Sequence, residues 1–476
     1  MVCVALSLLA CTHPPGFKPT YGPVLIAQPV EVPASWSVVE PASQAVGPHT
    51  AGQAPAWPWW QRFDDPQLGA LVHQALAANT SIRSAQAALE QARALRAVAS
   101  AGLWPTLTAS AQASRTAIGE QAATDQVQVG LAGNWLPDLS GGQRSALDVR
   151  LATVEALCAT LGDVQVGIAA EVALNYITLR AAQARLSLAS DNLVSQIETL
   201  HLTLWREQAG LLSRVESEQA ITAVEQTRAL LPALQTSVEQ SQHALAVLTA
   251  QPPAALVASL TPQGTAAPIP LLRQDMAISI PADTLRQRAD VRAAERQVAA
   301  SLARVSVADA ARMPSFVLSG SLGLSALTLG TLTHGASALS TVLAGVSWPV
   351  FDGGAARAQL QAEQAALEQS RAAYQAVVLG ALRDVEDSLV ALRGDRQRHQ
   401  SLSLAANAAT QAATLARQRF DSGLIDFQTV LSTQRAQLTT QDELASAHAS
   451  VGSSQVRLFK ALGGGWRDDS TRASAP

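Results

Sequence analysis

The residue types that most often carry enzymatic or metal chemistry are present in this chain, but their spacing does not assemble a site. The eight histidines are scattered, and none stands in an HExxH or other metal-ligating spacing. Neither a GxSxG nucleophile motif nor a GxxxxGKS/T phosphate loop occurs, and GGGW at 463–466 is too near the C-terminus for a helix to follow it. These patterns argue against an enzyme and predict no metal site.

Cysteine chemistry is indicated near the N-terminus. Of the three cysteines, too few for a disulfide framework, Cys158 lies in the apolar stripe of a predicted helix. Cys11 ends LSLLAC, which resembles a bacterial lipoprotein signal that is cut before a lipid-carrying cysteine. We therefore predict a signal over 1–10 and a covalent lipid on Cys11, with no other cofactor; a chance cysteine is the alternative. Because the signal is short and lacks Lys and Arg, we also expect the true start codon to lie upstream.

Composition narrows the class of protein further. The 476 residues are 48% hydrophobic, 15% charged and 4% aromatic, and the net charge is −4. No basic surface indicates nucleic acid, and no polybasic run indicates an anionic membrane leaflet. No run of 18 or more apolar residues follows the N-terminus, so the sequence predicts no transmembrane helix.

The chain contains an internal sequence repeat. NWLPDLSGGQRSAL (134–147) resembles SWPVFDGGAARAQL (347–360), and REQAGLLS (206–213) resembles RFDSGLID (419–426) at an offset of 213. A third pair, 82–105 and 291–314, aligns at an offset of 209. A period near 210 is too long for a solenoid and indicates a duplicated half, which we expect to run helix, strand, strand, long helix, turn, helix.

This duplication defines the expected organisation. After the signal we place an irregular Pro-rich lead at 11–60 and a Pro-rich linker at 251–281. The first repeat, 61–250, holds a helix, a β-hairpin at 106–137, a long helix at 143–208 and a helix at 212–250. The second repeat, 282–462, holds a helix, a β-hairpin at 315–351, a long helix at 355–420 and a helix at 425–462. A tail at 463–476 ends the chain.

The hairpin segments alternate with period two. In SFVLSGSLGL (315–324) one face carries Phe316, Leu318, Leu322 and Leu324, and the other carries Val317, Ser319, Ser321 and Gly323. Each segment is close to the 9–11 residues that a tilted transmembrane strand needs. A lipid-facing wall around a wet lumen requires this alternation, although a half-buried soluble sheet shows it as well.

The helical segments favour the membrane alternative. No proline interrupts 143–208, which corresponds to roughly 100 Å of continuous helix. Apolar residues recur there every seven positions, as in helices that pack side by side along their length. A helix this long does not fit inside a compact domain. A coiled-coil rod is the alternative, but a rod does not carry paired hairpins of this kind at one end.

Four strands are too few to close a barrel, because small barrels need about eight. An open sheet edge in lipid leaves backbone groups without hydrogen bonds, at several kcal/mol each. The barrel must therefore be shared, and three chains give twelve strands. This fold class is mainly helical with membrane β-structure, in a homotrimeric duct. The pairs Gly141–Gly142 and Gly353–Gly354 stand where each strand gives way to the long helix, and we expect them to permit that change of direction.

Further motifs carry a family resemblance over nearly the whole chain. They are WWQRFDDPQL (59–68), LRQRADVRAAE (285–295), RFDSGLIDFQTVLSTQRAQL (419–438) and LFKALGGGW (458–466). With the duplicated stretches, they resemble the TolC-like outer membrane efflux proteins of Gram-negative bacteria. The lipoprotein branch that serves resistance-nodulation-division pumps, the NodT type, is the most similar. Ala289 is a departure, since the family usually has Pro there.

This resemblance implies a passive trimeric duct for drugs or other small molecules. A twelve-stranded barrel would lie in outer membrane lipid, anchored also by Cys11, above a long periplasmic α-helical barrel. Residues 251–281 and the C-terminus would form an equatorial domain. The implied partners are a periplasmic adaptor (membrane fusion protein) and an inner-membrane transporter of the resistance-nodulation-division class.

The resemblance also implies roles for the periplasmic tips. Arg206, Gly210 and Ser213 match Arg419, Gly423 and Asp426, and they are candidates for adaptor docking or for plain helix-turn chemistry. The family gate often pairs an Asp with an Arg. The Arg aligns with Arg435, but Ser432 occupies the usual Asp position. Asp421 and Asp426 are further gate candidates as a carboxylate ring, or they are solvated turn residues.

Three other functions remain as alternatives. A duct of the same fold for metal ions or for secreted proteins differs only in cargo. Metal ducts sometimes carry His- or Met-rich segments, whereas this chain has three methionines and dispersed histidines. A periplasmic coiled-coil adaptor belongs to another class, and it would need a lipoyl-like β module and would lack the duplicated hairpins.

Overall fold

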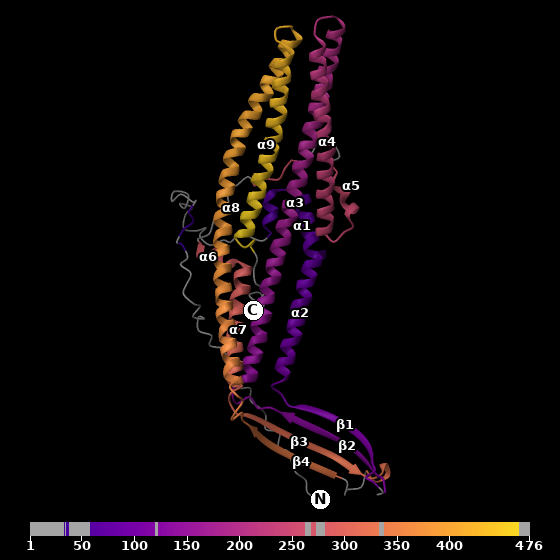
Figure 1. Cartoon of the computed structure of the whole chain (residues 1–476), viewed down its shortest axis with the longest axis vertical. Helices are drawn as coiled ribbons and strands as arrows, with labels where there is room; N and C mark the ends of the chain where they lie inside the picture. Colours follow the sequence, from indigo (N-terminus) through magenta and orange to yellow (C-terminus); the bar gives the residue numbers. More distant parts are fainter. Residues whose placement is uncertain are drawn as a thin grey trace.

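A computed structural model describes residues 33, 35–37, 58–119, 122–261, 268–272, 281–332 and 338–465. Cys11, the predicted signal, most of the lead and the tail from Trp466 lie outside these residues. The molecule is elongated, with two helical hairpins at one end and a small sheet at the other (Figure 1).

Each half of the chain contributes one set of elements. The first half has η2 (Trp59–Phe63), α1 (Pro66–Ala78), α2 (Thr80–Ala101), β1 (Thr106–Thr116), β2 (Thr124–Trp135), α3 (Gly142–Gln208) and α4 (Arg214–Leu248). Between the halves lie η3 (Pro253–Leu256) and α5 (Val257–Leu260). The second half has α6 (Pro281–Gln287), α7 (Ala289–Ala310), β3 (Ser315–Ala326), η4 (Leu329–Thr331), β4 (Ala338–Ser347), α8 (Ala355–Asp421) and α9 (Phe427–Ala461).

The predicted duplication is visible in the lengths of the helices. α2 and α7 each have 22 residues, α3 and α8 each have 67, and α4 and α9 each have 35. Side-chain contacts repeat as well. Trp135 Nε1 donates to the carbonyl of Leu103 at 3.1 Å, and Trp348 Nε1 donates to that of Arg312 at 3.2 Å. The two halves are therefore the same unit in structure as well as in sequence.

The sequence predicted one helix ahead of each hairpin, whereas the structure has two. Asn79 ends α1 and caps α2, because its side chain accepts hydrogen bonds from the backbone N–H groups of Ser81 and Ile82. Arg288, with extended backbone, separates α6 from α7 in the same way. Both breaks stand at equivalent positions, 209 residues apart.

The four strands form one antiparallel sheet in the order β1-β2-β3-β4. Val129 lies opposite Leu324 and Leu131 opposite Leu322, so apolar side chains share one face. Gln128 lies opposite Ser325 and Asn134 opposite Ser319, on the other face. The alternation predicted for the hairpins is thus kept in register across the sheet.

The second hairpin is shorter than the expected 315–351. β4 ends at Ser347, and Trp348 instead anchors the following turn through its indole hydrogen bond. β1 and β4 are the two edges of the sheet. Large apolar side chains along these edges, including Leu107, Val342 and Val346, are exposed in the single chain.

The core follows the long helices. α3 packs against α4, α7 and α9, and α8 packs against α7 and α9. Among the described residues, only α3 is by itself long and apolar enough to cross a membrane, and 44% of its most apolar stretch is buried against other parts of the chain. Its buried residues are mostly small, with several alanines, which permits close approach between helices.

An aromatic cluster fixes the middle of the molecule. The rings of Trp59 and Phe459 stack with centroids 5.1 Å apart, and Trp60 and Phe63 complete the cluster. The motifs WWQRF and LFKALGGG, far apart in sequence, therefore meet there. Leu272, from the described part of the linker, donates its backbone N–H to Gln455 of α9 at this height, at 3.0 Å.

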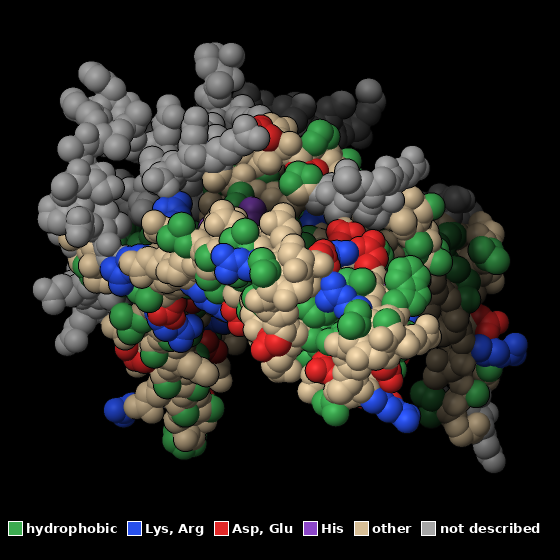
Figure 2. Space-filling model, turned by 90° about the horizontal axis from the view of Figure 1, so that it is seen from above, with side chains coloured by type: hydrophobic (Ala, Val, Ile, Leu, Met, Phe, Trp, Pro, Cys, Tyr) green, Lys and Arg blue, Asp and Glu red, His purple; other side chains and the backbone are tan. Residues whose placement is uncertain are grey.

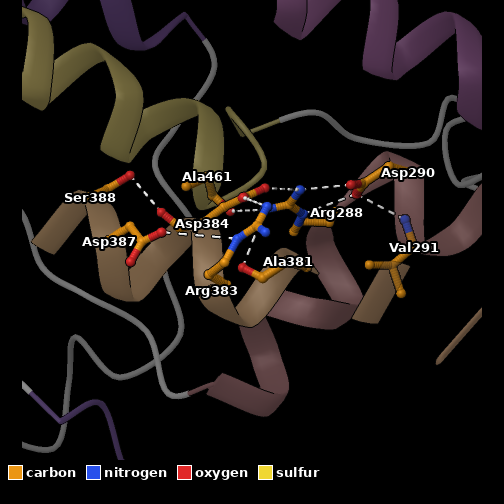
Figure 3. A network of polar contacts seen from close by, with 9 residues as sticks. All are labelled: Arg288, Asp290, Val291, Ala381, Arg383, Asp384, Asp387, Ser388 and Ala461. Carbon is orange, nitrogen blue, oxygen red and sulfur yellow. Dashed lines mark hydrogen bonds and ion pairs between the residues drawn. The ribbon is translucent and has the colours of Figure 1, made fainter. Parts of the chain in front are cut away.

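A polar network joins the helix break of the second half to the end of α9 (Figure 3). The buried Arg288 donates to the carbonyl of Ala461 at 3.0 Å and forms ion pairs with Asp290 at 2.6 Å and Asp384 at 3.3 Å. In the first half, Asn79 Nδ2 donates to the carbonyl of Leu248 at 2.8 Å. Leu248 and Ala461 end the equivalent helices α4 and α9, so each break residue holds the last helix of its own half.

The Arg288 network predicts an unequal effect of two matched substitutions. Arg288→Ala removes the donor to the Ala461 carbonyl and the ion pairs with Asp290 and Asp384, and it is expected to cost about 2 kcal/mol. Asn79→Ala removes a helix cap and is expected to cost about 1 kcal/mol. Thermal unfolding followed by circular dichroism should rank the melting temperatures as wild type, then Asn79→Ala, then Arg288→Ala. Arg288→Lys is the control that keeps the charge, and a wild-type melting temperature for Arg288→Ala would contradict the assignment.

Candidate functional site at the helix tips

The two hairpin tips share one backbone conformation. Gly210 and Gly423 have φ angles of 72° and 73°, in the left-handed region that favours glycine. Gly210 N–H donates to the carbonyl of Glu207 at 2.8 Å, and Gly423 N–H donates to that of Phe420 at 2.9 Å. These bonds satisfy carbonyls at the ends of α3 and α8, which explains why a glycine stands at each turn.

Each tip then starts the returning helix with a capping residue. Ser213 forms a capping box with Glu216, and its hydrogen bond lowers the pKa of the Glu216 carboxyl. Asp426 accepts from the backbone N–H of Thr429 at 2.8 Å, and bonds from Thr429 lower the pKa of Asp426. These caps also explain why α4 and α9 begin two residues later than predicted. Ser213 and Asp426 therefore have local structural roles.

Arg206 ties the two tips together within one chain. Its guanidinium donates to the carbonyls of Phe420 at 3.1 Å and Asp421 at 3.2 Å, both at the C-terminal end of α8. It also lies 4.3 Å from the centroid of the Phe420 ring. A cation at a helix C-terminus is favoured by the helix dipole as well as by these hydrogen bonds. Arg419, its counterpart, is exposed, and among the described residues its side chain forms no hydrogen bond or ion pair.

The tips also expose a pair of leucines that were not among the predicted site residues. Leu211 and Leu424 follow the two turn glycines at equivalent positions and are 73% and 74% exposed. Trp205 and Val215 are exposed on the same hairpin as Leu211. Seen along the long axis, apolar side chains lie among charges of both signs (Figure 2). The repeated Gly-Leu dipeptide was the signal in the sequence that indicated this surface.

The gate candidates do not meet as an ion pair within one chain. Asp421 and Arg435 are exposed, and no ion pair joins Arg435 to Asp421 or Asp426 among the described residues. Arg435 borders a depression lined by α4 residues that include Arg214 and Glu218. Ser432 donates its hydroxyl to the carbonyl of Thr429 on its own helix at 2.9 Å. A gate made from these side chains therefore requires contacts between chains.

At the strand-to-helix junctions, three of the four glycines adopt a backbone conformation that favours glycine. Gly141, Gly353 and Gly354 have positive φ angles, and Gly141 and Gly354 precede α3 and α8 directly. Gly142 also lies at the junction, as the first helical residue of α3, but its φ angle is not positive. A Cβ there would approach the Cβ of Ala310 at 3.2 Å, so close packing is its constraint.

An aspartate that the sequence reading missed closes each junction. Asp138 accepts from the backbone N–H groups of Gln143 and Arg144, at 3.1 and 2.8 Å. Asp352 accepts from those of Gly354 and Ala356, both at 2.8 Å, and these bonds lower its pKa. The Asp that shortly precedes each Gly-Gly pair was the available signal. Within the described ranges there is also no group of three metal-ligating side chains.

Comparison with known proteins identifies the architecture. The family model described as "Outer membrane efflux protein" matches residues 71–251 and 280–464, one segment in each half. The chain belongs to this family. The efflux protein is 32% identical, over 98% of its length and 97% of the relative's, to "Pyoverdine export outer membrane protein OpmQ" of Pseudomonas putida. It is 30% identical to "Outer membrane protein OprJ" of Pseudomonas aeruginosa, over 97% and 95% of the two chains.

Solved structures agree with the family assignment. The outer-membrane channel OprN superposes on the efflux protein with a TM-score of 0.82 at 32% identity, over 92% of this chain and 99% of that one. The Campylobacter jejuni CmeC channel, at 21% identity and a TM-score of 0.84, shows the same fold. The efflux protein is thus a mainly helical outer membrane channel component of an efflux system, and its family comprises channels rather than enzymes.

Asp426 offers a test that separates the cap from the charge. Asp426→Asn keeps an oxygen that accepts from Thr429 but removes the negative charge, whereas Asp426→Ala removes both. We expect faster amide hydrogen exchange over 427–430 in Asp426→Ala alone. A channel gated by this carboxylate should conduct more in both variants, and one in which Asp426 only caps α9 should change in Asp426→Ala alone. Planar-bilayer conductance decides between the two roles, and unchanged exchange in Asp426→Ala would contradict the cap.

Proposed function

We propose that three copies of the chain form a passive duct in a tripartite efflux system. The observation that carries this proposal is the four-stranded sheet with β1 and β4 as open edges. In lipid, each unpaired N–H and C=O group along an edge costs several kcal/mol. Pairing β4 of one chain with β1 of the next removes both edges, and three chains give a closed barrel of twelve strands.

The duplication supports a specific pairing at this junction. Within the chain, β2 pairs with β3, and Trp135 lies opposite Leu318. β1 is equivalent to β3, and β2 is equivalent to β4. The β4–β1 junction between chains is therefore the counterpart of the β2–β3 junction within one chain. By the same correspondence, Trp348 lies opposite Ala109 of the neighbouring chain. Six nearly equivalent hairpins then surround one lumen, with their apolar faces toward lipid.

We place the partners at the opposite end. The helices would form the periplasmic part of the duct, and the hairpin tips would meet a periplasmic adaptor that connects to an inner-membrane transporter of the resistance-nodulation-division class. Leu211 and Leu424 support this docking role, since exposed apolar residues at equivalent positions would give six similar anchors in a trimer. Arg206, Gly210, Ser213, Arg419 and Gly423 would shape the docking turns.

The proposed cargo is small organic molecules. Relatives of this chain include the pyoverdine export protein and "Toluene efflux pump outer membrane protein TtgF" of Pseudomonas putida, which is 28% identical over 99% of this chain and 97% of its own. A duct does not need a specific binding pocket, because the pump selects what enters. The cargo of this chain would therefore be set by its transporter.

Conductance of the purified full-length protein in planar bilayers tests the duct. We expect stable single channels from a species whose mass by light scattering is that of three chains. Arg435→Ala should raise the open fraction if this side chain narrows the periplasmic end. Arg62→Ala, a substitution at the aromatic cluster far from the tips, is the matched control and should leave it unchanged. Folded monomers without conductance would contradict the proposal.

We further propose that Cys11 carries the lipid anchor, on the strength of the LSLLAC motif. Metabolic labelling with a palmitate analogue should mark the wild-type protein and the Cys158→Ala control. Cys11→Ser should lose the label and keep the length of its uncut signal. Equal labelling of Cys11→Ser and wild type would show that the motif is a chance match.

A further inference from the structure

The contact that Arg206 makes at the tips within one chain has an equivalent, involving Arg419, that is not formed within one chain. Arg206 of α3 binds the last carbonyls of α8, those of Phe420 and Asp421. At the 213-residue offset between the halves, Arg419 is the counterpart of Arg206. Glu207 and Gln208 are the counterparts of Phe420 and Asp421. The equivalent contact therefore joins Arg419 of α8 to the last turn of α3. Within one chain this contact is not made, and the exposed Arg419 side chain is without a hydrogen bond among the described residues.

The packing order of the helices shows where the missing contact belongs. In one chain α4 packs on α3, α3 on α9, and α9 on α8. Among the described residues, no other long helix covers the far flank of α4 or the tip half of α8, and Trp36 and Ser37 contact α8 only near its middle. Because α8 corresponds to α3 and α4 corresponds to α9, the in-chain junction of α3 with α9 has its counterpart between α8 and α4 of a second copy. Arg206 contacts the C-terminal end of α8 in its own chain. In this arrangement Arg419 lies beside the C-terminal end of α3 in the second copy.

The burial of apolar side chains supports the same junction. Leu379 and Val390 of α8 are 57% and 48% exposed, whereas their counterparts in α3, Val166 and Ile177, are 4% and 0% exposed. Leu415 is also exposed, and its counterpart Leu202 packs into the core shared by the tip halves of the helices. Apolar residues of α8 are thus exposed at positions where the equivalent residues of α3 are buried. This difference is expected for a surface that a second copy covers.

We propose that the guanidinium of Arg419 binds the C-terminal end of α3 in the neighbouring copy, donating to the carbonyls of Glu207 and Gln208 and pairing with the Glu207 carboxylate. This inference rests on the trimer proposed above. The two kinds of tip contact would then differ in chemistry. Arg206 lies over an aromatic ring, whereas Arg419 faces a carboxylate at the equivalent position. The Arg419 contact between chains would therefore weaken with salt more than the Arg206 contact within a chain.

Matched cysteine pairs test the geometry in the full-length protein with Cys3→Ala, Cys11→Ser and Cys158→Ala, which leaves no native cysteine. Arg206→Cys with Asp421→Cys reports the in-chain contact, and Arg419→Cys with Gln208→Cys reports the proposed one. After reaction with a short bis-maleimide, the first pair should stay at monomer mass in denaturing gels. The second pair should give covalent dimers and trimers, and each single-cysteine variant should give neither.

The outcomes separate this inference from the trimer itself. Light scattering before the reaction establishes whether three chains associate. Absence of trimers would overturn the proposed function, whereas trimers in which the second pair stays at monomer mass would overturn this inference alone.

Charge reversal tests the chemistry of the pair. Arg419→Glu and Glu207→Arg should each raise the open fraction in bilayers by about two- to fivefold, the range expected for an exposed ion pair. The double variant should recover part of the wild-type value. Raised salt should increase the open fraction of the wild type, because it screens an attraction, and should decrease that of each single variant, because it screens a repulsion. A double variant no closer to wild type than either single variant would show that Arg419 and Glu207 do not pair.

Discussion

Backbone hydrogen bonding at the edges of the sheet is the constraint on which the rest of this structure depends. A membrane offers no water to an unpaired N–H or C=O group, so a four-stranded sheet is incomplete in lipid. The chain makes three strand pairings itself, including the β2–β3 pairing that joins its two repeats. The remaining junction needs another copy, and the large apolar side chains exposed along β1 and β4 are consistent with that need.

The duplication repeats the same arrangement of hairpin and helices along the whole length of the molecule. Helices of 67 residues leave both hairpins, and their equal lengths bring the two tips to the same height, where Arg206 joins them. The two repeats differ in the residues that stand at some equivalent positions. Asn79 and Arg288 hold equivalent helix ends, but only Arg288 gathers Asp290 and Asp384 around it. The two halves thus share one backbone arrangement but differ in the side chains that hold equivalent helix ends.

The sequence was most informative where one physical rule acts alone. Period-two alternation predicted both hairpins, and the absence of proline predicted α3. Elements decided by a local side-chain bond were missed. Nothing in the periodicity showed that Asn79 would cap a new helix or that Asp138 would cap the start of α3, since such bonds compete with helix continuation residue by residue. The tip glycines were found from the repeat, but the contact of Arg206 with α8 depends on packing between distant segments.

The most direct test of the account is a cryo-electron microscopy structure of the full-length protein in lipid nanodiscs. We expect three chains around one axis, with β4 of each chain hydrogen-bonded to β1 of the next and Trp348 opposite Ala109, so that twelve strands leave no free edge. A closed barrel with another number of chains, or three chains whose β1 and β4 edges remain unpaired in the lipid, would contradict it.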